Sequence, residues 1–167
     1  MSRGQALSDQ IRSARFYTKD LLKATSQDHW FQMPSEGVTH VAWQVGHITV
    51  SQYYLGLFHV RGTSDEDKSL LPTDFGALFG KDSVPSANAG DYPSASEIVQ
   101  VLDAVHARVK DEIAAVDEST WDTPTEGPEH PFFKTKWHSA SFVPAHEFLH
   151  AGQIGLLRRL LGEKSLR

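Results

Sequence analysis

Four long segments of the chain repeat their apolar residues every three or four positions, and this pattern restricts the fold more than any other feature. No segment has the sustained apolar–polar alternation of a β-strand. Amphipathic helices of this length bury their apolar faces best against one another. The sequence therefore predicts an all-α protein, a four-helix bundle with long connections, formed as a single domain by residues 1–167. The helices are expected at 4–25, 39–61, from 94 to beyond 113, and 139–161.

Capping residues and glycines indicate where these helices begin and end. Thr39 is a suitable N-cap for the second helix, and Gly62 is placed to end it. Ser94 and Glu97 have the spacing of a capping box at the start of the third helix. Pro144 lacks a backbone donor, so the fourth helix is expected either to begin near 141–143 or to be kinked there.

Two long connections are too apolar to be free linkers. The first, 63–93, contains "LLPTDFGALFG" and is expected to pack on the bundle, cover a pocket or join a subunit interface. Its length means that the second and third helices need not be antiparallel neighbours. The second, 117–138, is expected to form a packed cover because it contains Trp121, Phe132, Phe133 and Trp137.

Composition narrows the function classes. The formal charge of −5, from 16 basic and 21 acidic residues, gives no extended cationic surface and disfavours nucleic-acid binding. No apolar run approaches the roughly 20 residues that span a bilayer, and the N-terminus lacks the apolar core of a secretory signal, so we expect a soluble, cytoplasmic protein with no membrane partner. With no cysteine, any thiol chemistry needs a small thiol from outside.

Nine histidines are the one compositional excess, and three of them have a geometric relation. His146 and His150 lie one helical turn apart on the apolar stripe of the fourth helix, and His47 lies on the inward face of the second. Gly46 and Gly152, beside these histidines, suggest close backbone approach. Three neutral imidazoles predict a divalent metal site with positions open to substrate. Zinc or nickel suits this ligand set, and iron is compatible with it.

The residues 146–150 also match the H-E-x-x-H pattern of zinc peptidases, but the rest of that pattern is missing. No histidine follows His150, Glu163 is the only later side-chain carboxylate, and no strands are predicted to hold a peptide. A peptidase is therefore disfavoured. Glu147 stays a candidate proton acceptor, although an exposed glutamate paired with a base fits it equally well. His40, two turns before the ligand of its helix, is a second catalytic candidate that would line the pocket.

The segments "WQVGHITVSQYYL" and "HEFLHAGQIGLLRRLLG" resemble the DinB-like superfamily, also called the YfiT-like metalloenzymes, over essentially the whole chain. The resemblance implies a four-helix bundle, commonly dimeric, that binds one divalent ion through three histidines. His47, His146 and His150 match those ligands, and Gly152 and Gln153 match the G-Q that follows them.

Characterised members of this superfamily include thiol S-transferases that use bacillithiol, mycothiol-dependent isomerases and the metal-binding half of ergothioneine-forming sulfoxide synthases. The isomerases and synthases carry a second domain that is not expected here, so a stand-alone transferase is the nearest comparison. The resemblance and the predicted site lead to the hypothesis of a homodimeric metal-dependent enzyme that transfers a low-molecular-weight thiol to an electrophilic small molecule. Two alternatives stay open: a metal-dependent hydrolase that uses bound water, and a non-catalytic metal-binding or stress-response module.

Overall fold

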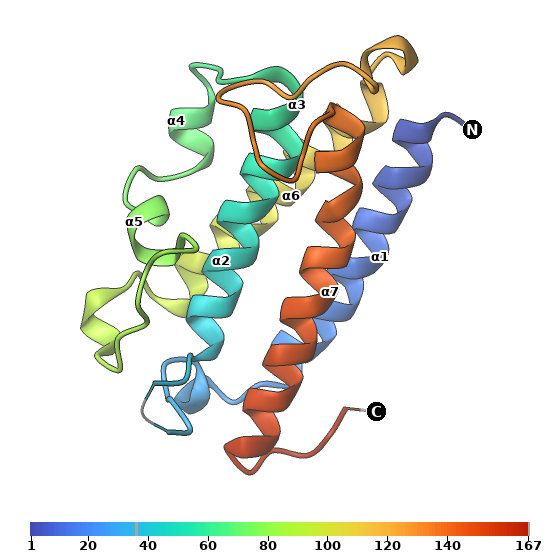
Figure 1. Cartoon of the computed structure of the whole chain (residues 1–167). Coiled ribbons are helices and arrows are strands. Elements are labelled where there is room, and N and C mark those ends of the chain that lie inside the picture. Colours follow the sequence, from blue (N-terminus) through green and yellow to red (C-terminus); the bar gives the residue numbers. More distant parts are fainter. Residues whose placement is uncertain (36, 167) are drawn as a thin grey trace.

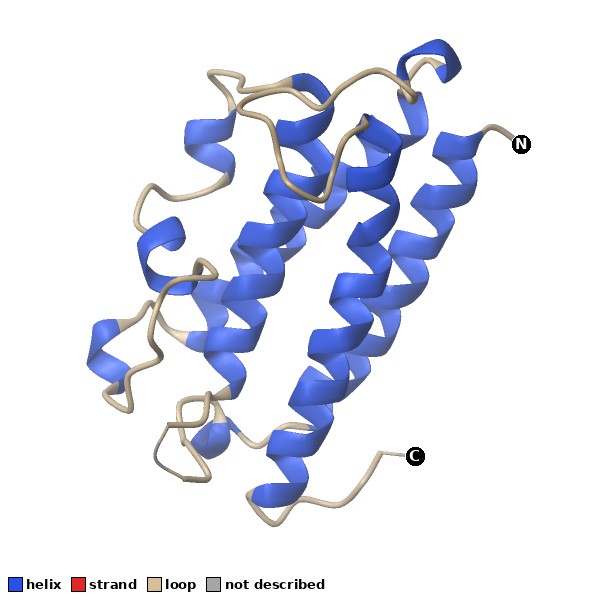
Figure 2. Ribbon diagram, in the orientation of Figure 1, coloured by secondary structure: helices blue, strands red, loops and turns tan. Residues whose placement is uncertain are grey.

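Four long helical segments run along one another in the computed structural model, which describes residues 1–35 and 37–166 (Figure 1). They are α1 (Arg3–Ala24), α2 (Val41–Tyr53) with its continuations η2 (Tyr54–Phe58) and α3 (His59–Arg61), α6 (Ala95–Ala115), and α7 (Lys136–Leu160). The described residues form no strand, only an isolated bridge between Pro124 and Thr135 (Figure 2). No helix among them has the length and apolar content to cross a bilayer. The all-α prediction is confirmed.

The long helices are arranged so that α2 faces α7. Both α1 and α2 pack against α6 and α7, which places α1 and α2 at diagonal corners. The long connection after α3 returns the chain to the other end of the bundle, so α2 and α6 run parallel, whereas α2 and α7 run antiparallel (Figure 1). The antiparallel pair brings the middle of α2 beside the middle of α7.

The core follows the predicted apolar stripes. Every stripe residue of α6 is completely buried: Ile98, Leu102, Val105, Val109 and Ile113. Buried side chains from all four long helices form two clusters toward opposite ends of the bundle. The first includes Phe75 and Phe79, and the second includes Trp121, all from the connections. Both connections therefore contribute to the core.

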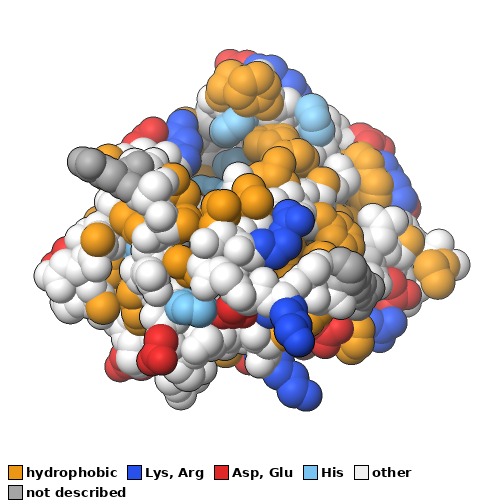
Figure 3. Space-filling view, turned by 90° about the horizontal axis from the view of Figure 1, so that it is seen from below, with side chains coloured by type: hydrophobic (Ala, Val, Ile, Leu, Met, Phe, Trp, Pro, Cys, Tyr) orange, Lys and Arg blue, Asp and Glu red, His pale blue; other side chains and the backbone are white. Residues whose placement is uncertain are grey.

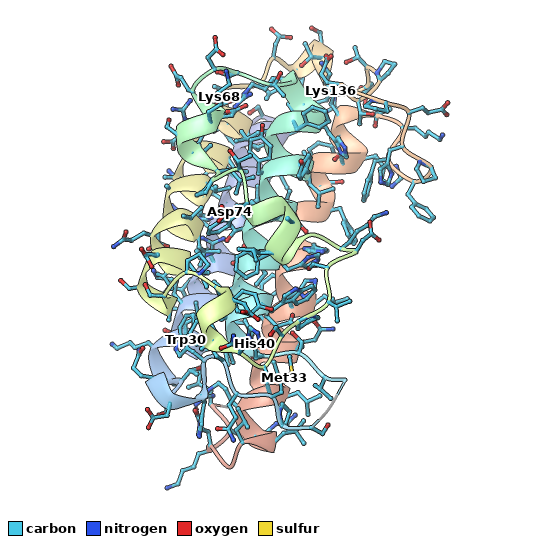
Figure 4. All side chains as sticks on the ribbon, turned by 90° about the vertical axis from the view of Figure 1, so that its left-hand side faces the viewer. Trp30, Met33, His40, Lys68, Asp74 and Lys136 are labelled. Carbon is cyan, nitrogen blue, oxygen red and sulfur yellow. The ribbon has the colours of Figure 1, made fainter. Side chains whose placement is uncertain are left out.

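The first connection packs on the bundle, which was one of the three alternatives predicted for it. Its short helix α4 (Asp67–Leu70) packs against α6, and α5 (Phe75–Phe79) packs against α2. Figure 4 labels Lys68 in α4 and Asp74 directly before α5. Phe75 and Phe79 are buried, and Asp67 accepts a hydrogen bond from the Tyr53 hydroxyl at 3.0 Å. Two 3₁₀ turns, η1 (Gln27–His29) and η3 (Ala89–Asp91), complete this side of the molecule.

The second connection, which contains η4 (Glu118–Thr120), matches the predicted cover in part. Trp121 is completely buried, and Trp137 packs edge-on against it with ring centroids 5.5 Å apart. Phe133 packs against the core, but Phe132 is 73% exposed, so the prediction was wrong for that residue.

Two predicted helix starts were also wrong. His40, not Thr39, is the N-cap of α2, because its ring nitrogen Nδ1 accepts a hydrogen bond from the Trp43 backbone. Thr135 caps α7, so this helix begins at Lys136 and not at 139 or at 141–143. Pro144 lies in its interior, so the alternative of a kink at this position stays a prediction. A proline there removes one backbone donor without ending the helix. The predicted end of the second helix is correct, since Gly62 has φ 78° directly after Arg61.

Candidate metal centre

Three histidines from two antiparallel helices converge on one point. His47 comes from α2, and His146 and His150 come from successive turns of α7. Each offers a ring nitrogen, and these three atoms all lie within 4.8 Å of one another. The ring centroids of His146 and His150 are 4.4 Å apart, and that of His47 lies 4.7 Å from His150 and 5.2 Å from His146. These are the histidines that the sequence analysis selected.

The donor atoms of His146 and His150 already have the spacing of two ligands of one divalent metal ion. The Nε2 atoms of His146 and His150 are 3.2 Å apart, close to the roughly 3.3 Å between two nitrogens that are each about 2.05 Å from a tetrahedral ion. The Nδ1 of His47 lies 2.8 Å from the Phe79 carbonyl oxygen, and the Nδ1 of His150 lies 2.6 Å from Gln44 Oε1. Both acceptors require a protonated Nδ1, which leaves each Nε2 with a free lone pair for the shared centre.

The ring of His47 is held on two sides. The indole of Trp43 stacks on it with a centroid distance of 4.8 Å and an interplanar angle of 6°. Trp43 in turn donates a hydrogen bond from Nε1 to Ser83 Oγ at 2.9 Å. The connection that carries Ser83 and Phe79 therefore fixes the orientation of one metal-ligating candidate.

The two glycines next to the site behave differently. A Cβ atom on Gly46 would lie 2.3 Å from the ring of Phe79, so this position requires glycine for a close approach, as predicted, although the partner is a side chain. A Cβ on Gly152 would meet nothing within 4 Å. The prediction that another backbone approaches Gly152 closely was therefore wrong.

Burial keeps the cluster neutral. Burial, and then the neighbouring histidines, lower the pKa of His146 to about 4 and that of His150 to about 3. Burial also lowers the pKa of His47, against the opposing effect of its hydrogen bond to Phe79. Near pH 7 the three rings are therefore unprotonated, which is the state that coordinates a metal.

Glu147 does not line the cavity and lies inside the bundle, where α7 packs against α1. Its carboxylate is 1% exposed and pairs with Arg15, with contacts of 2.7 Å to Nε and 3.2 Å to Nη2. Arg15 also donates to Gln52 Oε1 and to the Leu102 carbonyl oxygen. The alternative of an exposed Glu147 was wrong, although its pairing with a base was correct, because Arg15 is only 5% exposed and supplies a buried partner. Both carboxylate oxygens are committed to this pair.

His40 lies at the end of the bundle near Trp30 (Figure 4). It is completely buried, its Nδ1 caps α2, and its ring packs edge-on against Tyr92 with centroids 5.0 Å apart. Burial lowers its pKa to about 4. His40 does not line the cavity described below, contrary to the prediction, because its capping bond turns the ring into the core. These contacts support a structural role, and proton transfer by Glu147 or His40 has no geometric support.

A cavity of about 820 Å³ begins at the histidine cluster. His47, His146 and Ser51 line one end, and the loop from Gly80 to Ser83 forms part of the wall. In Figure 3, histidine side chains lie in and beside a hollow bordered by hydrophobic side chains. The cavity gives the cluster an open side where a small molecule can reach it.

The far end of the cavity is lined by Phe133, which belongs to the predicted cover, and by His59 and His130, which were not predicted from sequence. At a regular 100° per residue His59 would lie about 120° around the helix from His47. The π turn η2 lies between them and inserts one residue, which reduces the offset to about 20°. Sequence periodicity cannot reveal such a turn. His130 lies in an irregular loop, where periodicity gives no signal.

Comparison with known families gives one match. The model of the DinB superfamily matches residues 10–154. The matched span begins within α1 and ends within α7, so it includes all three converging histidines. Comparison with curated proteins gives no match.

Proposed function

The chain belongs to the DinB superfamily, and on this premise we propose that it is a metal-dependent enzyme that transfers a low-molecular-weight thiol to an electrophilic small molecule. The observation that carries the proposal is the set of three neutral imidazoles at one end of a cavity of about 820 Å³. Since the chain has no cysteine, the thiol comes from outside.

His47, His146 and His150 would hold the ion. Imidazole nitrogens suit zinc or nickel and are compatible with iron. A divalent ion bound there supplies positive charge that lowers the pKa of a coordinated thiol from its ordinary value of about 8.5. The Phe79 carbonyl and the Gln44 side chain fix the tautomers of His47 and His150, so that their Nε2 atoms face the reacting end of the cavity.

The transfer breaks two bonds and forms one. The S–H bond of the thiol breaks, and its proton passes to solvent through the open cavity. The sulfur then supplies the electron pair for a new C–S bond to the electrophilic carbon. The bond from that carbon to its leaving group breaks, and the leaving group departs with the bonding pair. Tyr54 and Phe142 line the cavity and provide an apolar wall for the electrophile.

The position of Glu147 supports a thiol nucleophile over water. In H-E-x-x-H hydrolases the glutamate takes the proton from water, but here Glu147 is buried against Arg15. A free thiol has a pKa of about 8.5, against about 15.7 for water, and so needs less help to lose its proton. Among the described residues the ligand group contains three histidines and no cysteine, aspartate or glutamate, which supports a reactive centre over a closed structural one.

The proposal includes a small-molecule substrate, a homodimer and a cytoplasmic location, with no nucleic-acid or membrane partner. The cavity volume suits a small molecule, and the net charge of −5 disfavours nucleic acid. Leu149, Leu156 and Leu160 are about half exposed on the outer face of α7, where Gly152 leaves open space. This apolar face supports pairing with a second copy.

The test uses protein purified without a nickel column and then loaded with zinc. Several low-molecular-weight thiols are offered together with a chromogenic aromatic electrophile, and product formation is followed by absorbance. We expect a thiol-dependent rate that His146→Ala removes and that His138→Phe, at an exposed histidine outside the cavity, retains. Equal rates for wild type and His146→Ala would refute the proposal, and ester hydrolysis without thiol would favour the hydrolase.

A further inference from the structure

The π turn η2 frees one backbone carbonyl for a side chain of α7. In a regular α-helix the Leu55 carbonyl would accept from the His59 backbone N–H. Here that N–H bonds to the carbonyls of Tyr54 and Leu57 instead. The Leu55 carbonyl accepts from the Ser139 hydroxyl at 3.1 Å. A buried hydrogen-bond chain therefore links the two helices beside the cavity.

This chain fixes the tautomer of His59. Ser139 is completely buried and uses its only hydroxyl proton for the Leu55 carbonyl. Its oxygen, 2.8 Å from His59 Nδ1, must therefore accept a hydrogen bond from that nitrogen. A neutral imidazole with its proton on Nδ1 has a lone pair on Nε2. His59 thus offers the cavity a hydrogen-bond acceptor.

His130 has the opposite tautomer. Its Nδ1 lies 3.1 Å from the backbone nitrogens of both Phe132 and Phe133. Backbone N–H groups only donate, so this Nδ1 is an acceptor and the proton of the neutral ring is on Nε2. His130 thus offers the cavity a hydrogen-bond donor.

The two rings form a pair at a defined distance from the metal centre. Their centroids are 5.6 Å apart, and both residues line the far end of the cavity. Ser139, which holds His59, is seven residues before His146 on the same face of α7, a separation of about 10 Å along the helix. A single small molecule can therefore contact both ends of the cavity.

A hydrogen-bond donor and an acceptor side by side favour a ligand group that can both accept and donate a hydrogen bond. An amide or a hydroxyl offers both functions and complements the pair. A carboxylate only accepts, so it would place its charge against the lone pair of His59. Burial, and then the neighbouring His130, lower the pKa of His59, which keeps that lone pair available near pH 7.

We infer that His59 and His130 form a distal recognition pair that binds an uncharged amide or hydroxyl group on the tail of the thiol whose sulfur lies at the three-histidine cluster. This inference rests on the proposed function and specifies its substrate. The thiol carries its polar group roughly 10–18 Å from the sulfur, since Ser139 is seven residues from His146 and His59 is twelve residues from His47. Its chain passes the apolar side chains of Tyr54 and Phe142.

The test compares three synthetic alkanethiols of equal chain length that end in a primary amide, a carboxylate or a methyl group. Each is titrated calorimetrically into zinc-loaded protein near pH 7. Two hydrogen bonds to the amide predict binding about tenfold tighter than for the methyl compound. The carboxylate is expected to bind no tighter than the methyl compound. Equal affinity of the amide and methyl thiols would overturn the inference.

Two variants assign the preference to the pair. His59→Phe removes the acceptor, and His130→Asn removes the distal donor while its side-chain oxygen still accepts from the loop backbone. Each is expected to remove most of the tenfold preference for the amide. His138→Phe changes an exposed histidine outside the cavity and is expected to keep the preference. A preference that survives both changes at the pair would exclude these residues as its source.

Failure of the inference can be separated from failure of the proposed function. If the methyl thiol binds but the amide gains nothing, only the distal pair is refuted. If no thiol binds, the proposed function is refuted, and an alkyl amide without sulfur tests the pair alone by NMR of the imidazole nitrogens. Shifts confined to His59 and His130 would then support the pair, and unchanged resonances would refute it.

Discussion

Neighbouring residues of the sequence "HEFLH" belong to two polar regions with opposite properties. On one side of α7, His146 and His150 face His47, and their Nε2 atoms converge on one point at the cavity. Next to them on α7, the carboxylate of Glu147 pairs with Arg15 inside the bundle. The histidine region, formed by His47, His146 and His150, keeps lone pairs available to a ligand at the cavity. In the carboxylate region, formed by Arg15 and Glu147, both carboxylate oxygens already pair with the guanidinium, and Glu147 does not line the cavity.

The difference teaches that a polar residue in this bundle can act on a ligand only through donor or acceptor atoms that have no partner within the protein. A buried charge pair that is fully satisfied fixes the packing of the helices but offers nothing to a substrate. A neutral ring with one committed nitrogen and one open nitrogen is positioned and still reactive. Stability should therefore depend most on the carboxylate region, and metal affinity on the histidine region.

The largest effect is expected from Glu147→Leu. This change leaves the Arg15 guanidinium buried without its partner, so the free energy of unfolding should fall by about 3–5 kcal/mol. Urea denaturation measures this loss, and elemental analysis of the folded variant should still find the bound metal. The double variant with Arg15→Met should recover part of the stability, because no unpaired charge remains. Lost metal with unchanged stability would instead assign Glu147 to the metal centre.

His146→Ala should have the converse effect. Loss of one of three ligands is expected to weaken zinc binding at least about hundredfold, because structural zinc sites with four ligands contribute roughly 10–16 kcal/mol. Competition with a chromophoric chelator measures the affinity. Excess chelator should lower the Tm of the wild type, since the ion stabilises only the folded form, and should leave the Tm of the variant almost unchanged. Equal chelator sensitivity of both proteins would contradict the assignment.

Gln44→Leu should have a smaller effect on the same affinity. Gln44 accepts the hydrogen bond from His150 Nδ1 at 2.6 Å, so the change releases both the tautomer and the ring orientation. Loss of such a partner typically weakens metal binding by about 10–100-fold. The same competition measurement applies. Gln44→Glu keeps an acceptor and should retain the affinity, and an unaffected Leu variant would show that Gln44 does not position the ring.

The histidine region was predictable from sequence because its partners are set by helical spacing. His146 and His150 are one turn apart, and His47 lies on the apolar face of another helix, so a bundle brings them together. The same local rules predicted the capping box at Ser94 and the buried stripe of α6. The all-α fold needed only this periodicity.

The carboxylate region and the distal pair depend on contacts that periodicity does not contain. Arg15 and Glu147 are 132 residues apart in sequence. A charged side chain is usually exposed unless it has a buried partner of opposite charge, and local sequence does not show such a distant partner. His59 reaches the cavity only because a π turn changes the helical phase after Tyr53. In both cases a long-range contact or a backbone irregularity overrides the local pattern.

The smallest effect, measured over a single pH unit, is expected from the pH dependence of His106, which adjoins the carboxylate region. Its Nδ1 lies 3.4 Å from Gln52 Nε2, a donor, so a proton on that nitrogen would oppose the Gln52 amide. Burial, and then the charge of Arg15, lower the pKa of His106 to about 3. The unfolded chain takes up this proton near pH 6.5, and the folded chain does not.

Between pH 6.5 and about 3 the unfolded state therefore binds more protons at this position, so the stability contributed by a neutral His106 is complete above pH 6.5 and is lost as the pH falls. His106→Gln removes the titrating group. In urea denaturation of the metal-free proteins over this range, the free energy of unfolding of the wild type should decline more steeply than that of the variant. The difference is at most about 1.4 kcal/mol per pH unit, the slope for one proton. Parallel declines would mean that the His106 ring takes up its proton at the same pH in the folded and the unfolded protein. Water would then reach the region around Arg15, against the burial that its contacts with Glu147 and Gln52 imply.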